Sequence, residues 1–399
     1  ALTVTGSTTV SNGTLTLNGS TCIFNTGATA GGLITNHASA VVVADADSTC
    51  TFGSIALHSD GCDVRLAGTN TINKYLASTD IIIHAMNNTV DAASAFTVTT
   101  PDAKGFAVQD TSVTLTITPA SSIAYKLEDT MNVAALTISA NASLTTLDGS
   151  SNRGLNVTGT TSVSGTLTCN ASTISLGSGK TDGYGLNVAS GGTFTGGTGT
   201  HTWGSANLQA STTLTSGTTT INGVGGGHNY AFWADNNFTH NSGTVAFTRN
   251  GDQKFGESGS DAPTRTFNNL TVNKAGGELT WETDNPFACV VAGNLTITAG
   301  ELDTGPNNVA LTVTGDITNS GTLTSNNSAI SSRKLISTGT LSGGGSVYTV
   351  TGAGLGNTVR TVDLGGTVSG NVDVTLTGAG NNRHEDLQAS GNIRNLTIN

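Results

Sequence analysis

The sequence predicts an all-β protein that folds as an elongated parallel β-solenoid, in which successive coils of the chain stack on one another. Three observations predict this class: a segment that recurs along the chain, alternation of apolar and polar residues within it, and a composition poor in charged and aromatic residues. We expect the solenoid to be right-handed and to contain almost no helix.

The recurring segment is the first of these observations. ALTVTGSTTVSNGTLTLNGS at residues 1–20 returns as ALTVTGDITNSGTLTSNNSA at 310–329, and GLNVTGTTSVSGTLTCNAS at 154–172 is a looser copy. In each copy, short runs of aliphatic residues are separated by Gly or Asn-Gly. The distance between these runs leaves room only for a strand, a tight corner and another strand.

Alternation within the segment is the second observation. In residues 2–5, a period of two places Leu2 and Val4 on one face and the Thr hydroxyls on the other, as in a half-buried strand. Thr is β-branched and also tolerates water, so it suits the outer face. Several aliphatic residues in this pattern are expected to point inward: Leu155, Val157, Leu167, Leu270, Leu295, Leu311 and Val313.

Composition is the third observation. Charged residues make up 10% of the chain, against roughly a quarter in ordinary soluble domains. Aromatic residues make up only 5%, so a large aromatic core is excluded. Disorder is disfavoured as well, because hydrophobic residues reach 36% in regular alternation. One coil cannot close a core from such residues, but many stacked coils can.

A single solenoid over residues 1–399 is the expected domain organisation, with a series of β-sandwiches as the alternative. The five prolines are scattered and no sustained change of composition divides the chain. Coils are expected to be less regular over about 30–130. Residues 125–136 offer only a brief helical pattern. Both ends of the chain lie within a strand-like sequence pattern, so we expect a processed chain or a segment of a longer protein.

Charge and hydropathy exclude several partners. The net charge is −11, and the 15 Lys and Arg residues are scattered rather than clustered. Nucleic acid and anionic membrane surfaces are therefore not expected as partners. The longest apolar run, residues 287–292, falls far short of the roughly 18 residues needed to span a membrane.

The five cysteines form no metal-binding spacing. Cys22, Cys169 and Cys289 lie in segments with a strand-like pattern and are expected to be small core residues. Cys50 and Cys62 lie about one expected coil apart, so a disulfide between them is considered, conditional on register. Unpaired thiols favour assembly in a reducing cytoplasm over secretion.

Segments 266–274, 293–302 and 311–315 resemble the repeats of large β-solenoid surface proteins. Such repeats occur in tail fibres and other virion-surface proteins of tailed bacteriophages, and in bacterial adhesins. The resemblance is strongest over 154–399 and carries no catalytic residues. It implies a structural and adhesive rod-like component of a phage virion, assembled in the host cytoplasm and located at the virion surface.

The partners that this resemblance implies are other virion proteins, further copies of the chain in a trimer, and a host surface glycan or receptor. The alternative is a bacterial cell-surface adhesin, which would be extracellular. A tailspike-like glycan hydrolase is a third class.

Catalytic chemistry has weak support in the sequence. A hydrolase needs two carboxylates about 5 to 9 Å apart. A metal group at His58, Asp60 and Asp63 is weighed, but solvated turns explain these residues better. We therefore expect no enzyme, no metal and no cofactor. The carboxylates considered are Asp45, Asp47, Asp60, Asp63, Asp252, Glu257, Asp261, Glu282 and Asp284.

Aromatic residues gather over 203–287, which holds more than half of the chain's Phe, Trp and Tyr. Stacking in the core is one interpretation, and a ligand-facing platform is the other, because Trp and Tyr rings stack on sugars. The repeat breaks over 228–257, so binding is expected there. Tyr230 and Trp233 are the preferred contacts, with Asp235 and His240 as polar partners. Phe232 and Phe247 are expected to face the core.

Overall fold

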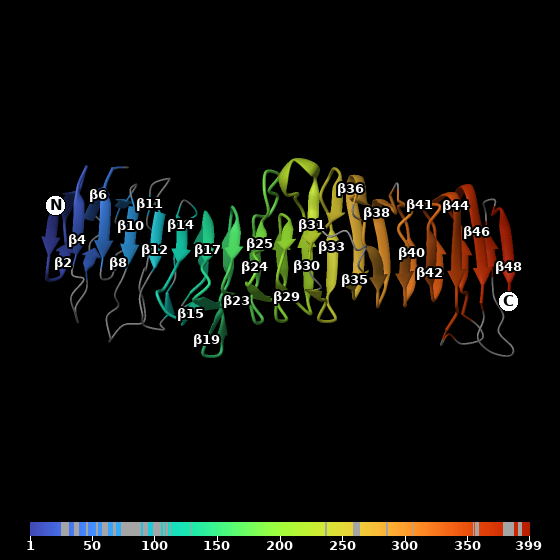
Figure 1. Cartoon of the computed structure of the whole chain (residues 1–399), viewed down its shortest axis with the longest axis horizontal. Coiled ribbons are helices and arrows are strands. Elements are labelled where there is room, and N and C mark those ends of the chain that lie inside the picture. Colours follow the sequence, from blue (N-terminus) through green and yellow to red (C-terminus); the bar gives the residue numbers. More distant parts are fainter. Residues whose placement is uncertain are drawn as a thin grey trace. The chain divides into compact units, whose positions relative to one another are not determined.

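The computed structural model confirms the β-solenoid. It contains parallel strands stacked coil upon coil (Figure 1). Its one helical element among the described residues is a 3-10 turn, η1 (Gly226–His228). The structure describes residues 1–24, 32–35, 40–44, 47–52, 55–57, 63–66, 69–72, 89–90, 95–98, 105–106, 108, 111, 113–127, 129–235, 238–257, 264–284, 286–305, 307–353, 355, 359–377, 387–389 and 393–399.

The chain divides into two compact units, each with its own stack of coils. Unit 1 comprises Ala1–Ser178 and Gly185–His201, and unit 2 comprises Gly179–Tyr184 and Thr202–Asn399. Strand β27 (His201–Trp203) contains the last residue of unit 1.

Unit 1 is built on one long parallel ladder. Its register is unbroken through the described strands that lie within residues 30–130. The strands of this ladder are β1 (Leu2–Val4), β4 (Thr21–Phe24), β7 (Thr49–Phe52), β10 (Thr69–Ile72), β12 (Ala95–Val98), β14 (Thr114–Ile117), β17 (Ala135–Ile138), β22 (Thr161–Val163) and β25 (Leu186–Val188).

Shorter ladders complete the coils of unit 1. One ladder contains β16 (Met131–Val133), β21 (Leu155–Val157) and β24 (Ile174–Leu176). Another contains β13 (Gly105–Phe106), β15 (Ile123–Leu127), β18 (Ala142–Thr145), β23 (Thr166–Thr168) and β26 (Thr193–Thr195). A third ladder contains β2 (Thr8–Val10), β5 (Leu33–Thr35) and β8 (Ile55–Leu57). A fourth contains β3 (Gly13–Thr16), β6 (Ala40–Ala44), β9 (Asp63–Leu66) and β11 (Thr89–Val90). A hairpin joins β19 (Leu147–Asp148) and β20 (Ser151–Asn152).

Unit 2 repeats a three-sided coil, and its three ladders are called first, second and third below. The first ladder is β30 (Thr218–Ile221), β33 (Thr244–Phe247), β36 (Asn269–Trp281), β38 (Leu295–Asp303), β40 (Asp316–Asn319), β43 (Lys334–Ser337), β45 (Val362–Leu364) and β47 (Leu387–Ala389). The second is β28 (Ala206–Leu208), β31 (Tyr230–Ala234), β34 (Gln253–Gly256), the ends of β36 and β38, β41 (Thr322–Asn326), β44 (Thr340–Val350) and β46 (Thr367–Leu376).

The third ladder closes the coil of unit 2. It contains β35 (Thr264–Phe267), β37 (Ala288–Val291), β39 (Leu311–Val313), β42 (Ala329–Ser332), the ends of β44 and β46, and β48 (Asn395–Ile398), preceded by the pair β29 (Ser211–Thr213) and β32 (Phe238–Thr239). The longest strands, such as β36, take part in two ladders because they continue around a corner of the coil.

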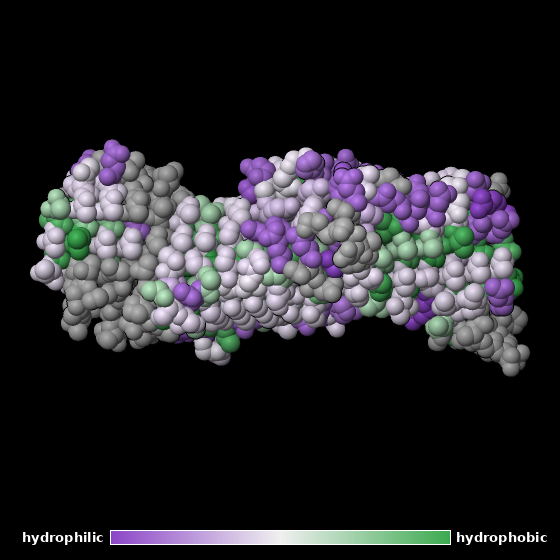
Figure 2. Space-filling model, in the orientation of Figure 1, coloured by the Kyte–Doolittle hydropathy of each residue, from purple (hydrophilic) through white to green (hydrophobic). Residues whose placement is uncertain are grey.

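The core is a set of aliphatic columns, as the alternation predicted. Leu155, Leu167, Leu270, Leu295 and Leu311 are fully buried. Val157 and Val313 are at most 2% exposed. The outward positions are mainly Thr, Ser, Asn and Gly, so much of the described surface in Figure 2 has intermediate hydropathy.

The conditional disulfide between Cys50 and Cys62 is wrong, because the Cys50 thiol is free and buried. The ladder partners of Cys50 are Cys22 in the preceding coil and Asn70 in the following one. The next coil therefore brings Asn70, not Cys62, into register. Cys62 itself lies outside the described residues. Cys22, Cys169 and Cys289 are free and buried, as predicted.

Candidate functional site

An irregular segment interrupts the second ladder of unit 2. After β30 the chain leaves the coil, makes the turn η1 and returns at β31. Gly226 has φ 65° and Asn229 has φ 60°, so both take the left-handed backbone region that such a tight excursion needs. A backbone bridge between Gly225 and Tyr230 closes the excursion.

A bulge in β31 turns two aromatic side chains outward. Strict alternation would place Tyr230 and Trp233 on opposite faces, because they are three residues apart. The register against β34 shifts between Tyr230 and Phe232, so Ala231 is the extra residue. Tyr230 and Trp233 are consequently half-buried, whereas Ala231 and Phe232 are fully buried.

The two rings pack against each other and above a glycine. The Tyr230 and Trp233 ring centroids are 4.4 Å apart at 74°, an edge-to-face arrangement. A Cβ atom on Gly256 would lie 2.5 Å from Trp233 Cε3 and 3.0 Å from Tyr230 Cδ1. Only glycine at this position lets the rings lie against the strand. We call Tyr184, Tyr230 and Trp233 the aromatic platform; the Tyr184 ring similarly lies against Gly225.

Carboxylates hold the polar ends of the platform. Trp233 Nε1 donates a hydrogen bond to Asp235 Oδ1 at 2.6 Å. Desolvation, a hydrogen bond to Glu282 and the nearby charges of Glu282 and Asp284 raise the pKa of the Tyr230 hydroxyl. Burial and the charge of Asp235 raise the pKa of Tyr184 to about 12. These contacts fix the ring orientations and leave ring faces and edges for a ligand.

The structure therefore assembles three of the four predicted site residues: Tyr230, Trp233 and Asp235. His240 lies in the turn after β32, where its Nδ1 accepts a hydrogen bond from the Ser242 N–H at 3.0 Å. Sequence reasoning missed Tyr184 as part of the platform and did not connect Glu282 and Asp284 with it. The available signal was the spacing of the coils. Tyr230 pairs with Lys254 one coil later, and Lys254 pairs with Thr280 one coil after that, shortly before Glu282 and Asp284.

The other aromatic residues of this region form a buried column, as the core-stacking interpretation predicted for them. Phe232 and Phe247 are fully buried, as predicted. Phe255 is the centre of the column, with ring contacts to neighbours in its own coil and in the next one. Those neighbours are Phe247, Phe267, Trp281 and Phe287.

A second feature of unit 2 is an open groove of about 900 Å³ at the corner between the first and second ladders. Glycines form its floor because the coils approach too closely for side chains there. A Cβ on Gly321 would lie 2.4 Å from the Gly300 carbonyl oxygen, and one on Gly339 would lie 2.0 Å from that of Gly321. The walls carry Asp252, Glu278, Glu301, Ser320, Thr322 and Thr340.

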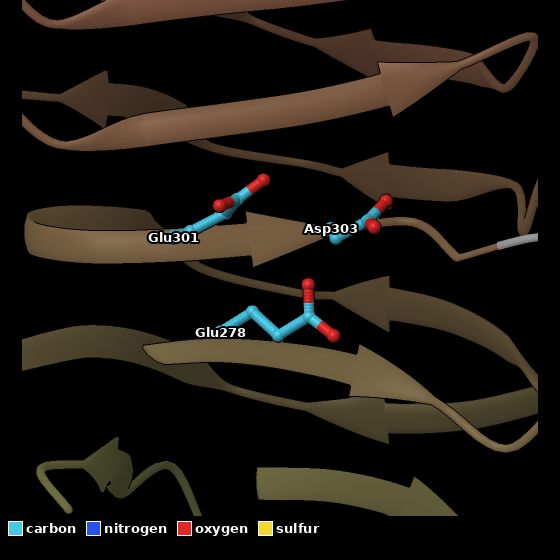
Figure 3. Close-up of side chains that lie close together, drawn as sticks. All are labelled: Glu278, Glu301 and Asp303. Carbon is cyan, nitrogen blue, oxygen red and sulfur yellow. The ribbon is translucent and has the colours of Figure 1, made fainter. Parts of the chain in front are cut away.

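Three half-buried carboxylates meet at one end of this groove. Glu278 on β36 and Glu301 and Asp303 on β38 have carboxylate oxygens within 4.8 Å of one another (Figure 3). Desolvation and the charges of Asp303, Glu301 and Asp252 raise the pKa of Glu278. Such a cluster can share a proton or offer oxygen ligands to a hard cation.

The carboxylates of the cluster already have partners within the protein. Glu301 Oε1 accepts from Thr324 at 2.6 Å, and Asp303 Oδ1 accepts from Asn326 at 2.6 Å. The sequence signal that was missed is a Gly followed by an acidic residue in successive coils. It occurs at Gly251-Asp252, Gly277-Glu278 and Gly300-Glu301.

The remaining carboxylates considered from the sequence do not form a second cluster among the described residues. Asp252 lies at the groove, where its Oδ1 accepts from the Glu278 N–H at 3.2 Å. Glu257 is buried against Arg265, and Asp47 lies in a turn. Asp45, His58, Asp60 and Asp261 lie outside the described residues, and only the backbone of Asp63 is described.

A buried lysine supports the corner beneath the groove. Lys274 is 1% exposed, and its Nζ donates to the carbonyls of Arg249 and Gly251 and to Gln253 Oε1. Burial, with the nearby Arg249, lowers the pKa of Lys274 to about 8, although Asp252 and Glu278 oppose the shift.

This pKa predicts a pH dependence of stability. Between about 8 and the ordinary value of 10.5, the folded protein binds fewer protons at Lys274 than the unfolded chain does. The destabilising contribution is therefore complete below pH 8 and disappears as pH rises through this window. We expect the unfolding temperature of the wild type, measured from pH 7 to 10.5, to rise relative to that of Lys274→Met. Parallel pH profiles of the two proteins would contradict the assignment.

Comparison of the chain with protein-family models, curated proteins and solved structures found no match. In the part of the chain that the structure describes, no helix has the length and apolar character needed to cross a membrane.

Proposed function

We propose that this protein is a structural and adhesive component of a tailed-phage virion, serving as a tail fibre or another surface fibre. One observation carries the proposal: ladders faced with Thr, Ser and Asn are interrupted by an excursion that presents Tyr230 and Trp233 outward. The hydroxyl-rich coils offer a uniform surface with few charges. Recognition of a host glycan or receptor therefore belongs to the aromatic platform.

Cysteine use supports assembly in the host cytoplasm. Cys22, Cys50, Cys169 and Cys289 are buried as free thiols. Burial raises the pKa of Cys50 to about 12. Such thiols are unreactive core residues and are compatible with a reducing compartment. A bacterial surface adhesin is the alternative with the same architecture, and neighbouring genes for tail or capsid proteins, as against secretion genes, distinguish the two.

Replacing Trp233 with Ala is expected to weaken attachment to host cells by roughly 1 to 3 kcal/mol, because an aromatic anchor is lost at the surface. The fold should be unchanged, since the ring lies outside the core. Attachment is measured per folded molecule, alongside the unfolding temperature. Thr296→Ala, at another outward position of unit 2, is the matched control. A sharp fall in unfolding temperature with unchanged attachment would assign Trp233 to the core.

A glycan hydrolase is the second candidate, and the groove with Glu278, Glu301 and Asp303 is the observation that favours it. Paired carboxylates with one raised pKa are the chemistry of glycoside hydrolysis. Our proposal is a non-catalytic protein, so incubation with host polysaccharide should release no reducing ends. Release that disappears in Glu278→Gln and Glu301→Gln would replace adhesion with hydrolysis.

A further inference from the structure

We propose that the aromatic platform binds an amine-bearing saccharide, such as a hexosamine unit with a free amino group, in preference to its neutral N-acetylated form and to anionic sugars. The inference rests on the proposed adhesive function and names the ligand class of that site. It is carried by the charges that surround the platform and by the state of its polar groups.

Carboxylates outnumber free cations around the two outward rings. Asp235 contacts Trp233, and Glu282 contacts Tyr230, with Asp284 close enough to act on the same hydroxyl. The nearby cations are largely neutralised or offset. Lys180 Nζ pairs with Asp182 at 2.7 Å, and buried Arg265 pairs with Glu257 at 3.0 Å.

Two basic side chains do remain beside Tyr230. Lys254 is its ladder partner on the next coil, and His228 lies 5.6 Å away between ring centroids. The charge of Lys254 also acts on Glu278 in the groove. His228 is exposed. The platform therefore keeps a negative surrounding charge at neutral pH, which attracts a cation and repels uronate, sulfate or phosphate groups.

The aromatic faces of the rings can bind a cation, whereas their polar groups are not available to bind a hydroxyl-rich sugar. Trp233 Nε1 and the Tyr230 hydroxyl are engaged by Asp235 and Glu282, so neither is available to orient a neutral sugar. An ammonium group lying over an aromatic face is attracted by the ring quadrupole, most strongly over Trp. The apolar C–H face of the same sugar ring can stack on the remaining aromatic surface.

One acceptor at the site has no partner among the described residues. Glu282 Oε2 is buried and receives no hydrogen bond there, although the same carboxylate bonds the Tyr230 hydroxyl. A carboxylate oxygen accepts strong hydrogen bonds from ammonium donors, directly or through a bridging water. An amine at the platform supplies such donors, whereas an acetamido group supplies one neutral N–H and adds bulk.

The test compares two oligosaccharides that differ only at nitrogen: a β-1,4-linked glucosamine hexamer and its fully N-acetylated counterpart. Binding is measured by calorimetry and by tryptophan fluorescence at neutral pH and low salt. Trp203 and Trp281 are at most 1% exposed, so a ligand-dependent fluorescence change reports on Trp233. We expect the glucosamine hexamer to bind about tenfold more tightly, the scale of one cation–π contact with partial desolvation.

Matched charge variants separate local recognition from general attraction. Glu282→Gln with Asp284→Asn should abolish the preference for the amine form, because it removes the carboxylates beside Tyr230. Asp316→Asn with Asp363→Asn removes the same number of charges from Arg-paired surface sites of unit 2 and should leave the preference intact. If both double variants lose the preference equally, attraction is non-specific and the inference is wrong.

Failure of the inference and failure of the proposed function give different results. Equal affinity for the two hexamers, or binding of neither, overturns the ligand class. Host-cell attachment that still depends on Trp233 would leave the adhesive function standing in those cases. Tighter binding of the glucosamine hexamer that survives Trp233→Ala would place the amine elsewhere and overturn the inference as well.

Discussion

Replacing Leu311 with Asp should destabilise unit 2 by more than about 4 kcal/mol, the range of an unpaired charge buried in a core. Leu311 is fully buried in β39, and its ladder partners are Cys289 and Ile330. The inward column contains no basic group at these two neighbours that could pair with the new carboxylate. The lost apolar contacts add to the cost of desolvation. Urea unfolding monitored by circular dichroism gives the change in free energy.

The adjacent residue provides the control. Thr312 is exposed on the same strand, so Thr312→Asp introduces the same side chain into water and should have little effect on unfolding. Similar losses of stability in the two variants would mean that the alternation of β39 does not face the core as described.

Much of the ladder structure could be predicted from this sequence because a strand has a strict period of two. Leu311 and Val313, or Leu155 and Val157, alternate with polar residues, and both pairs are buried as that period requires. A shift of one residue would expose the whole apolar set, so register within a strand is strongly specified.

Register between coils could not be predicted in the same way. Corners of a solenoid accept different numbers of residues, since loops lie outside the core and long ones cost little. Cys50 shows the consequence: the coil that follows it places Asn70 in register, a position that sequence spacing alone did not identify. The glycine floor of the groove has the same origin, because it depends on which corners stack.

The platform combines predictable and unpredictable features. An irregular aromatic segment indicated Tyr230 and Trp233, but alternation alone would have turned one of them inward. The bulge at Ala231 decides their shared direction, and no residue type marks it. Glu282 comes from the second coil after that of Tyr230, so its contact with Tyr230 required the register of the ladder.

A buried ion pair below the platform was also not anticipated. Arg265 on β35 is 4% exposed and Glu257 is 1% exposed, with 3.0 Å between Arg265 Nη2 and Glu257 Oε2. Arg265 Nε and Nη2 also donate to the carbonyl oxygen of Ala234 at 3.1 and 2.8 Å. The guanidinium therefore fastens the end of β31, immediately before Asp235, to the third ladder.

Arg265→Met should consequently cost about 3 to 5 kcal/mol, because it leaves a buried carboxylate without its partner. The double variant Arg265→Met with Glu257→Met should recover a large part of this loss, since apolar residues of similar size replace both charges. Arg394→Met, which breaks the exposed pair with Asp373, should change stability little and serves as the surface control. Chemical unfolding of the four proteins measures these differences.

Recovery of stability in the double variant need not restore binding, and this separates the two roles of Arg265. Ala234 would still lack the guanidinium donors, so the chain leading to Asp235 would be held less firmly. Because Asp235 fixes Trp233 through Nε1, the platform should lose orientation and attachment should fall even where stability has returned. Full attachment by a stable double variant would show that the ion pair supports the core alone, and that Asp235 holds Trp233 without it.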